Sequence, residues 1–319
     1  YWTDIPARTL WRWNPSDGKA ASWALPEQAG CLAVRRAGGL LLAMEQGIRV
    51  LDRLPAAGEA ADPVPAAAVA HAEPGMRFND GRCDRQGRFW AGTMVQDTSL
   101  APSAGRIYRY ARGELRESAL GGFITPNGMG FSPDGRTMYL SDSHPSRQIV
   151  WAFDYDIDAG RPERQRVFIE KLPAGRPDGA AVDADGCYWI CGNDAGMLYR
   201  YTPAGRLDRS IALPVAKPAM CAFGGAELDT LFITTIRPPS CSPDAQVAML
   251  VALLDALQVE RADVVANDSG GAVAQLLVAH HPERVRSLLL TNCDTEEDSP
   301  PPALLPVIAL AKQGRFVDE

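Results

Sequence analysis

The sequence predicts an all-β protein, a six-bladed β-propeller that is incomplete at both ends and is followed by a short α/β segment. Three observations predict this class. A repeat of about 50 residues runs through the first three quarters of the 319 residues. Within each copy, short stretches of alternating apolar side chains are separated by Gly, Pro and Asp turns. After the last copy, the apolar period changes from two to 3.6 residues.

The repeat is clearest in three segments that align without a gap at their start. Each has a polar Asn or Asp at a lead position, a Gly eight residues later, and then a strand rich in aromatic residues. Successive lead positions are 48 and 51 residues apart. The segments are RFNDGRCDRQGRFWAGTM from Arg77 (lead Asn79, then Gly87), TPNGMGFSPDGRTMYLSDS from Thr125 (Asn127, Gly135) and RPDGAAVDADGCYWICGND from Arg176 (Asp178, Gly186).

Weaker copies around Cys31 and Ala219 bring the visible copies to five. About four strands every 40 to 50 residues is typical of a propeller blade. The first residues, YWTDI, match the second strand of a blade, so we expect the innermost strand of that blade to precede Tyr1. Counting this blade gives six. The sixth begins near Lys217 and is expected to lack its last two strands.

The lead positions predict a polar site at the propeller axis. Because each innermost strand starts at the central channel, Asn79, Asn127 and Asp178 should be neighbours in space. Their oxygen atoms suit a hard cation such as Ca²⁺ or Mg²⁺. A single Asn-Gly or Asp-Gly pair usually marks a turn, but recurrence at one repeat position favours a site. Asp134, Asp183 and Asp185 are instead assigned to turns.

These three segments resemble the senescence marker protein, gluconolactonase and luciferin-regenerating enzyme family, also called regucalcin-like, over residues 1 to about 240. The resemblance implies a six-bladed propeller that holds one divalent metal at its axis and hydrolyses a sugar lactone. It implies metal ligation by Asn127 and Asp178 and substrate contact by Arg77 and Asn79. Asp178 is also the expected general base. Ca²⁺ is the first choice of metal, with Zn²⁺, Mg²⁺, Mn²⁺ or Fe²⁺ as alternatives.

One ligand of the family pattern has no counterpart in this sequence. The family's third protein ligand is a Glu in the first innermost strand, which is expected to lie before Tyr1. Glu45 ends a second-strand segment, LLLAME, and is a poor replacement. Two protein ligands in place of three should weaken metal binding.

The expected domains are a propeller over residues 1–240 and an α/β-hydrolase-like fragment with a Pro-rich tail over residues 241–319. Residues 244–258 have helical periodicity, and a strand, a helix and a further strand follow. Residues 244–295 resemble the nucleophile region of α/β-hydrolases of the haloalkane dehalogenase and epoxide hydrolase type. In VVANDSGG, Asp268 has small residues two positions before and after it, as a nucleophile on a strand-to-helix turn requires.

The Asp268 segment is expected to lack its catalytic partners. Only 51 residues follow Asp268, and the nearest histidines, His280 and His281, lie about 18 Å along the helix that leaves the turn. A nucleophile of this type needs a histidine and an orienting acid within hydrogen-bonding reach.

Composition excludes several other functions. A net charge of −7 without a dense Lys/Arg cluster argues against nucleic acid. The seven scattered cysteines contain no CxxC pair and indicate a reducing compartment. The sequence has no long apolar run and no signal-peptide pattern, so we expect a cytoplasmic protein with no membrane partner. Its oligomeric state cannot be read from the sequence.

The leading hypothesis is therefore a metal-dependent lactonase that acts on a small sugar lactone. One alternative is a non-catalytic, calcium-binding propeller. The second alternative is an α/β-hydrolase that uses Asp268.

Overall fold

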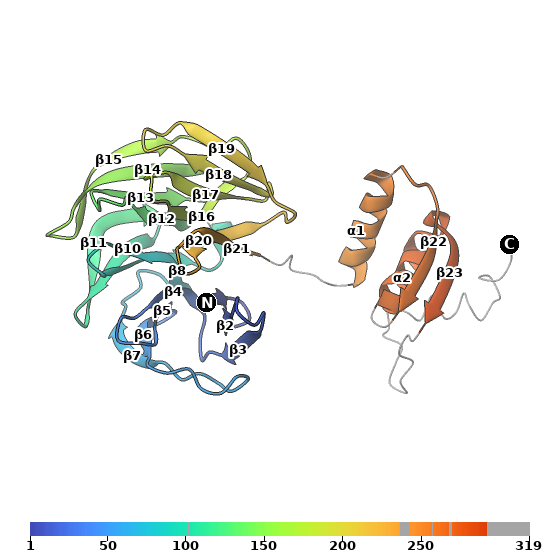
Figure 1. Cartoon of the computed structure of the whole chain (residues 1–319), viewed down its shortest axis with the longest axis horizontal. Coiled ribbons are helices and arrows are strands. Elements are labelled where there is room, and N and C mark those ends of the chain that lie inside the picture. The colour runs from blue at the N-terminus through green and yellow to red at the C-terminus, as the bar shows by residue number, and fades with distance from the viewer. Residues whose placement is uncertain (101, 237–242, 257, 268–269, 292–319) are drawn as a thin grey trace. The chain divides into compact units, whose positions relative to one another are not determined.

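The computed structural model describes residues 1–100, 102–236, 243–256, 258–267 and 270–291. The chain divides into two compact units, Tyr1–Ile236 and Arg237–Glu319 (Figure 1). Each unit has its own hydrophobic core.

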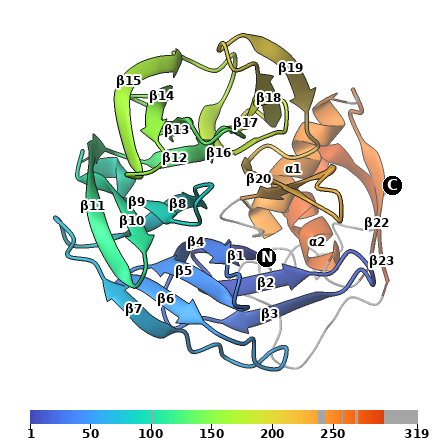
Figure 2. The same ribbon diagram turned by 60° about the vertical axis from the view of Figure 1, so that its left-hand side comes forward.

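The first unit is a β-propeller, as the sequence predicted. Its sheets radiate from a centre around which the innermost strands β4, β8, β12 and β16 are arranged (Figure 2). Four sheets have four antiparallel strands each. One sheet contains β4 (Ala29–Val34), β5 (Leu40–Met44), β6 (Gly47–Leu51) and β7 (Val64–Ala68), and the next contains β8 (Met76–Cys83), β9 (Phe89–Val95), β10 (Gly105–Ala111) and β11 (Glu114–Phe123). A third contains β12 (Pro126–Phe131), β13 (Thr137–Asp142), β14 (Ile149–Asp156) and β15 (Arg161–Ile169). The fourth contains β16 (Arg176–Val182), β17 (Tyr188–Asn193), β18 (Met197–Tyr201) and β19 (Leu207–Ala212).

Two smaller sheets complete the first unit. The first has three strands, and the last has only two. They are β1 (Trp2–Asp4), β2 (Thr9–Trp13) and β3 (Ala20–Ala24), and β20 (Pro218–Gly224) with β21 (Thr230–Thr235). A short 3₁₀ helix, Thr98–Leu100, follows β9.

The predicted count of six blades is not reached in the described residues. They hold five blades of three or four strands, and the two-stranded sheet β20–β21 stands where a sixth would be. The physical reason lies in the sequence after Thr235. The alternating pattern that builds the outer strands of the other blades gives way to the helical pattern of residues 243–256.

Aromatic side chains fill the space between neighbouring blades. Trp90 on β9 contacts Phe131 on β12 and Tyr155 on β14, with ring centroids 6.5 and 5.9 Å apart. All three are buried in one cluster that joins the four-stranded sheets β8–β11 and β12–β15. Such packing of apolar faces is the dominant stabilising term of sheet-on-sheet folds.

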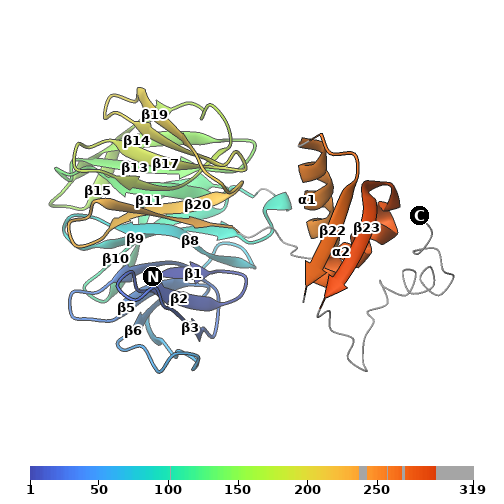
Figure 3. The ribbon, with the colours of Figure 1, turned by 45° about the vertical axis from the view of Figure 1, so that its right-hand side comes forward.

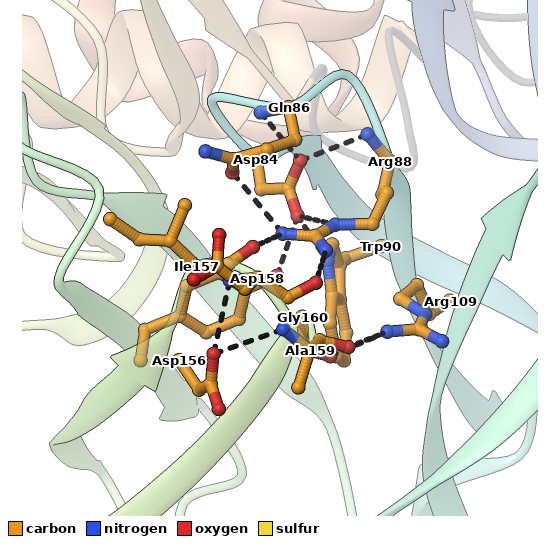
Figure 4. Close-up of polar contacts among 11 residues, drawn as sticks. Asp84, Gln86, Arg88, Trp90, Arg109, Asp156, Ile157, Asp158, Ala159 and Gly160 are labelled. Carbon is orange, nitrogen blue, oxygen red and sulfur yellow. Dashed lines mark hydrogen bonds and ion pairs between the residues drawn. The ribbon is translucent and has the colours of Figure 1, made fainter.

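A buried carboxylate ties the same two sheets together. Asp84, in the turn between β8 and β9, accepts hydrogen bonds from Arg88 Nε at 2.5 Å and Trp90 Nε1 at 3.3 Å (Figure 4). Tyr155 Oη also donates to Asp84, at 2.5 Å. Because a buried charge is tolerated only when it is paired and hydrogen-bonded, this network fixes the turn against the neighbouring blade.

Two arginines extend this contact to the turn between β14 and β15. Arg88 donates to the carbonyl oxygens of Ile157 and Asp158, and Arg109 donates to those of Ala159 and Gly160 (Figure 4). Four backbone acceptors of one blade are thus bonded by side chains of the blade before it.

A carboxylate that accepts several hydrogen bonds also stabilises the equivalent turn between β16 and β17. Asp183 accepts from the Cys187 amide at 2.8 Å, Trp189 Nε1 at 2.9 Å and Arg200 Nε at 2.8 Å. Asp134 accepts from Ser132 Oγ at 2.6 Å, and Asp185 pairs with Arg200 at 2.9 Å. The assignment of Asp134, Asp183 and Asp185 to turns agrees with these contacts.

The second unit is a small α/β layer. Helix α1 (Pro243–Ala256) precedes strand β22 (Ala262–Asn267), helix α2 (Gly270–His280), a 3₁₀ turn (Pro282–Arg284) and strand β23 (Val285–Thr291). The strands are parallel and lie side by side (Figure 3). Val247 of α1 and Leu276 and Leu277 of α2 form its buried core. None of the helices that the structure describes combines the length and apolar character needed to span a membrane.

Candidate active site

The starts of the innermost strands bring the predicted polar residues together. Strand β12 packs between β8 and β16, as Figure 2 shows. This close approach requires Gly128, since a Cβ atom there would lie 2.5 Å from Tyr188 Oη and 3.2 Å from the Asp178 carbonyl oxygen. The lead position of one repeat therefore lies beside that of the next.

A chain of hydrogen bonds joins three of the four predicted site residues. Arg77 Nη1 donates to Asn79 Oδ1 at 2.9 Å, and Asn79 Nδ2 donates to Asn127 Oδ1 at 2.8 Å. Asn127 Nδ2 in turn donates to Ser143 Oγ at 2.6 Å. Each amide is oriented by its neighbours, so the oxygen and nitrogen atoms of the set have fixed directions.

Burial lowers the pKa of the Arg77 guanidinium. Desolvation lowers the pKa of its guanidinium to about 10, and the Glu45 carboxylate partly offsets this. The group remains protonated near neutral pH, and it presents a rigid fork of donors to whatever enters the site.

Asp178 is the carboxylate of the site. Burial raises its pKa to about 7, a hydrogen bond from Asn193 Nδ2 at 2.5 Å opposes the rise, and the nearby Asp80 carboxylate reinforces it. Strongly perturbed carboxyl groups of this kind concentrate at functional sites.

Asn193 was missed by the sequence reasoning. It ends β17, its side chain is 1% exposed, and its Oδ1 atom is buried without a hydrogen-bond partner in the described part of the chain. Ser143 holds the equivalent place after β13 and contacts Asn127. In the sequence, each of these two residues follows an apolar second strand, in YLSDS and in YWICGN, and this pattern could have identified them.

Asp80 and Arg82 form a second polar layer beneath the lead residues. Asp80 is 4% exposed and accepts from the amides of Gly81 at 2.8 Å and Met129 at 2.9 Å. Arg82 donates to the carbonyl oxygens of Met129 and Ala180, so it spans three innermost strands. Neither residue was predicted from the sequence, because Arg82 reaches its partners through the packing of strands that are distant in sequence.

The site offers oxygen donors that fit a hard divalent cation. No group of three His, Cys, Asp or Glu side chains suited to a metal exists among the residues the structure describes. The donors are instead one carboxylate, Asp178, and the amide oxygens of Asn127 and Asn193. The Asn193 oxygen is buried without a partner, which costs about 1–3 kcal/mol unless a ligand satisfies it. Ca²⁺ and Mg²⁺ accept such mixed carboxylate and amide sets.

The remaining candidates lie outside this cluster. Glu45 Oε1 accepts from the Gln28 amide at 2.9 Å, so its carboxylate supports a backbone turn. Asp268 lies outside the described residues. His280 ends α2, about 15 Å along the helix from Gly270, and His281 lies 3.4 Å from Glu283.

The fold and the site define a β-propeller with a polar, carboxylate-containing axial site. Comparison with known proteins gives its family. Residues 1–237 match the model of the SMP-30/gluconolactonase/LRE-like region, and the chain belongs to this family. Residues 233–316 match the model of the α/β hydrolase fold.

Two curated relatives illustrate the similarity. A 6-deoxy-6-sulfogluconolactonase from Pseudomonas putida is 38% identical over 239 residues, which covers 74% of this chain and 79% of the relative. Regucalcin from Xenopus laevis is 30% identical over 237 residues, covering 73% and 77%.

Solved structures agree with the fold. A calcium-binding regucalcin from Agrobacterium tumefaciens is 28% identical with a TM-score of 0.68, covering 76% of this chain and 80% of that one. A luciferin-regenerating enzyme gives the same TM-score at 22% identity, covering 75% and 81%, and this likeness concerns the fold alone.

Proposed function

We propose that this chain hydrolyses the ring ester of a sugar lactone at the starts of β8, β12 and β16. The observation that carries the proposal is the series of hydrogen bonds that joins Arg77, Asn79 and Asn127 on β8 and β12, since β12 packs against β16, the strand that carries Asp178. Membership of the family and the name of the relative from Pseudomonas putida support lactone hydrolysis.

In this proposal Asp178 is the general base. Its carboxylate takes a proton from water as the water oxygen attacks the lactone carbonyl carbon. The bond between that carbon and the ring oxygen then breaks, and the proton returns from Asp178 to the departing ring oxygen. The product is an open-chain hydroxy acid. Arg77 and Asn79 hold the sugar oxygens and donate to the negative charge that develops on the carbonyl oxygen.

A divalent cation, with Ca²⁺ as the first choice, would be held by Asn127, Asp178 and Asn193. When bound, it supplies a Lewis acid that polarises the carbonyl group and acidifies a bound water. Asn193 holds one carboxylate oxygen of Asp178 by a hydrogen bond at 2.5 Å, and the other oxygen would act as the base.

We also propose finer features of the architecture. Sheet β20–β21 corresponds to the two inner strands of a sixth blade, and the lactonase unit ends near residue 240. Buried free thiols at Cys31, Cys191 and Cys221 support a reducing, cytoplasmic setting.

The experiment that tests this function is turnover of glucono-, xylono- and arabinono-lactone by the full chain. The chain is assayed after chelation and after addition of Ca²⁺, Mg²⁺, Mn²⁺, Zn²⁺ or Fe²⁺. Turnover that returns with one of these metals is expected. Metal binding measured by calorimetry without turnover of any lactone would instead identify a non-catalytic, calcium-binding propeller.

A further inference from the structure

A basic groove opens beside the candidate active site. Its volume is about 740 Å³, within the range of small-molecule sites. Charged side chains from three connections and one strand line it. They are Lys171 before β16, Arg176 at the start of β16, Asp194 after β17 and Lys217 before β20.

The groove is continuous with the surroundings of Asp178. Arg176 precedes Asp178 by two residues on β16, and it lies opposite Asn193 in the strand register. Asp194 follows Asn193, whose side chain bonds to Asp178. The charges of Arg176 and Asp194 both act on the pKa of Asp178, the first lowering it and the second raising it. The groove therefore borders the strand positions of β16 and β17 that lie next to Asp178 and its partner Asn193.

The groove carries an excess of positive charge. Among the described residues that line the groove, Asp194 is the one acid, and it pairs with Arg176 Nε at 2.6 Å and Lys217 Nζ at 3.6 Å. The contact with Asp194 uses Nε of Arg176, and the terminal nitrogens of this side chain have no hydrogen-bond partner among the described residues. Lys171 is exposed and has no acidic partner in the part of the chain that is described. This excess stands out in a chain whose net charge is −7.

We propose that this groove binds an anionic substituent of the substrate, so that the lactone hydrolysed here carries a sulfonate, phosphate or carboxylate group remote from its ring ester. The inference rests on the proposed lactonase function and specifies its substrate class. An Arg fork matches the oxygen geometry of such anions, and lysine ammonium groups add point charges. Binding energy gained at this remote group orients the ring ester against Asp178.

The test compares a neutral gluconolactone with analogues that carry a sulfonate, a phosphate or a carboxylate at carbon 6. Kinetics are measured for the full chain, for Lys171→Ala and Arg176→Gln, and for Lys19→Ala as a control that removes an equal charge from an exposed turn between β2 and β3. We expect at least one acidic lactone to be preferred. Lys171→Ala should raise the KM for the preferred acidic lactone about tenfold and leave the KM for the neutral lactone unchanged. Lys19→Ala should change neither KM.

The dependence of KM on ionic strength is an independent test of the same proposal. Raising the ionic strength should increase KM for the acidic lactone and leave KM for the neutral lactone unchanged, because screening weakens only the charged contact. Equal kcat/KM for neutral and acidic lactones, or equal losses on both in Lys171→Ala, would overturn the anionic-substrate proposal and leave the lactonase function standing. Absence of turnover on all four lactones would overturn the lactonase function itself.

Discussion

The ionised form of Asp178 destabilises the folded chain. Because burial raises its pKa to about 7, the folded chain binds the proton more tightly than the unfolded chain, where the ordinary value is about 4. A raised carboxyl pKa lowers the free energy of unfolding as the pH rises from about 4 to 7, and the loss is complete above pH 7. Active-site carboxylates commonly trade stability for reactivity in this way.

The substitution Asp178→Asn should therefore stabilise the metal-free chain at pH 8, by about 1–3 kcal/mol. Asparagine retains the shape of the side chain and an oxygen acceptor for Asn193, but it does not ionise. The measurement is urea denaturation with a chelator present, at pH 8 and at pH 4. We expect a gain at pH 8 and none at pH 4. A loss of stability at both pH values would show that the carboxylate is favourably solvated in the fold.

Asn193 is expected to support both the carboxylate and the cation. Asn193→Ala removes the hydrogen bond to Asp178 and the buried amide oxygen, and loss of such a supporting contact typically reduces metal affinity by about 10–100-fold. Calorimetric titration with Ca²⁺ measures the affinity. The matched control is Asn14→Ala, which removes a half-buried amide after β2 whose oxygen accepts from the Ser16 backbone N–H at 3.1 Å. Equal affinities in wild type and Asn193→Ala would remove Asn193 from the site.

The residues that were predicted and those that were missed differ in how the sequence encodes them. Asn79, Asn127 and Asp178 recur at one position of a repeat, so they could be found without coordinates. Asn193 and Arg82 act through strand register and across blades, which one sequence does not specify. Arg82 reaches the Ala180 carbonyl oxygen, 98 positions away, because the blades pack together. Asn193 reaches Asp178 through the pairing of β16 with β17.

At the scale of elements, the turns between the first and second strands of the blades depend on ionised carboxylates. Hydrogen bonds from Trp189 and Arg200 outweigh the effect of burial and hold the pKa of Asp183 below its ordinary value. A lowered carboxyl pKa contributes stability above the unfolded value, near 4, and that stability is lost as the pH falls through the folded value.

Asp183→Asn should lower the free energy of unfolding at pH 7 by about 1–3 kcal/mol, because it leaves the Arg200 guanidinium without its buried partner. It should also flatten the fall in stability below pH 4. Thermal unfolding followed by circular dichroism from pH 3 to pH 7 measures both effects. Asp185→Asn provides the control, since this carboxylate pairs with the same arginine but is 80% exposed, and we expect a change below about 0.5 kcal/mol. Equal effects of the two substitutions would contradict the role of burial.

The strands themselves were predictable because alternation of side chains and Gly or Asp turns is local information. The number of blades was not, since a blade needs its outer strands as well as its inner ones. The sequence after Thr235 lacks them, and the structure accordingly has only β20 and β21 in the last sheet.

At the scale of the whole molecule, we expect enzymatic activity in the first unit and none in the second. The first holds the hydrogen-bonded series of Arg77, Asn79 and Asn127 and the hydrogen-bonded pair of Asp178 and Asn193. The second has the strand–helix–strand pattern that matches the α/β hydrolase fold, and Asp268 lies outside its described residues. The histidine at the end of α2 is about a full helix length from the turn where a nucleophile would lie.

Asp268→Asn should therefore leave lactone turnover and metal affinity unchanged. The same variant should show no loss on an ester or a haloalkane, because the wild-type chain is expected to have no activity on these compounds. Assays of all three substrate types with wild type and Asp268→Asn measure this. Ester or haloalkane turnover that disappears in Asp268→Asn would establish a hydrolase in the second unit.

Lactone hydrolysis should depend on the Asp178 carboxylate, and this is tested by metal-restored lactone turnover of wild type, Asp178→Asn and the surface control Asp185→Asn. Loss of a positioned general base lowers kcat by about 10²–10⁴-fold. We predict a loss of this size in Asp178→Asn, with Asp185→Asn at the wild-type rate. A folded Asp178→Asn chain that retains the wild-type kcat would contradict the assignment of the active site.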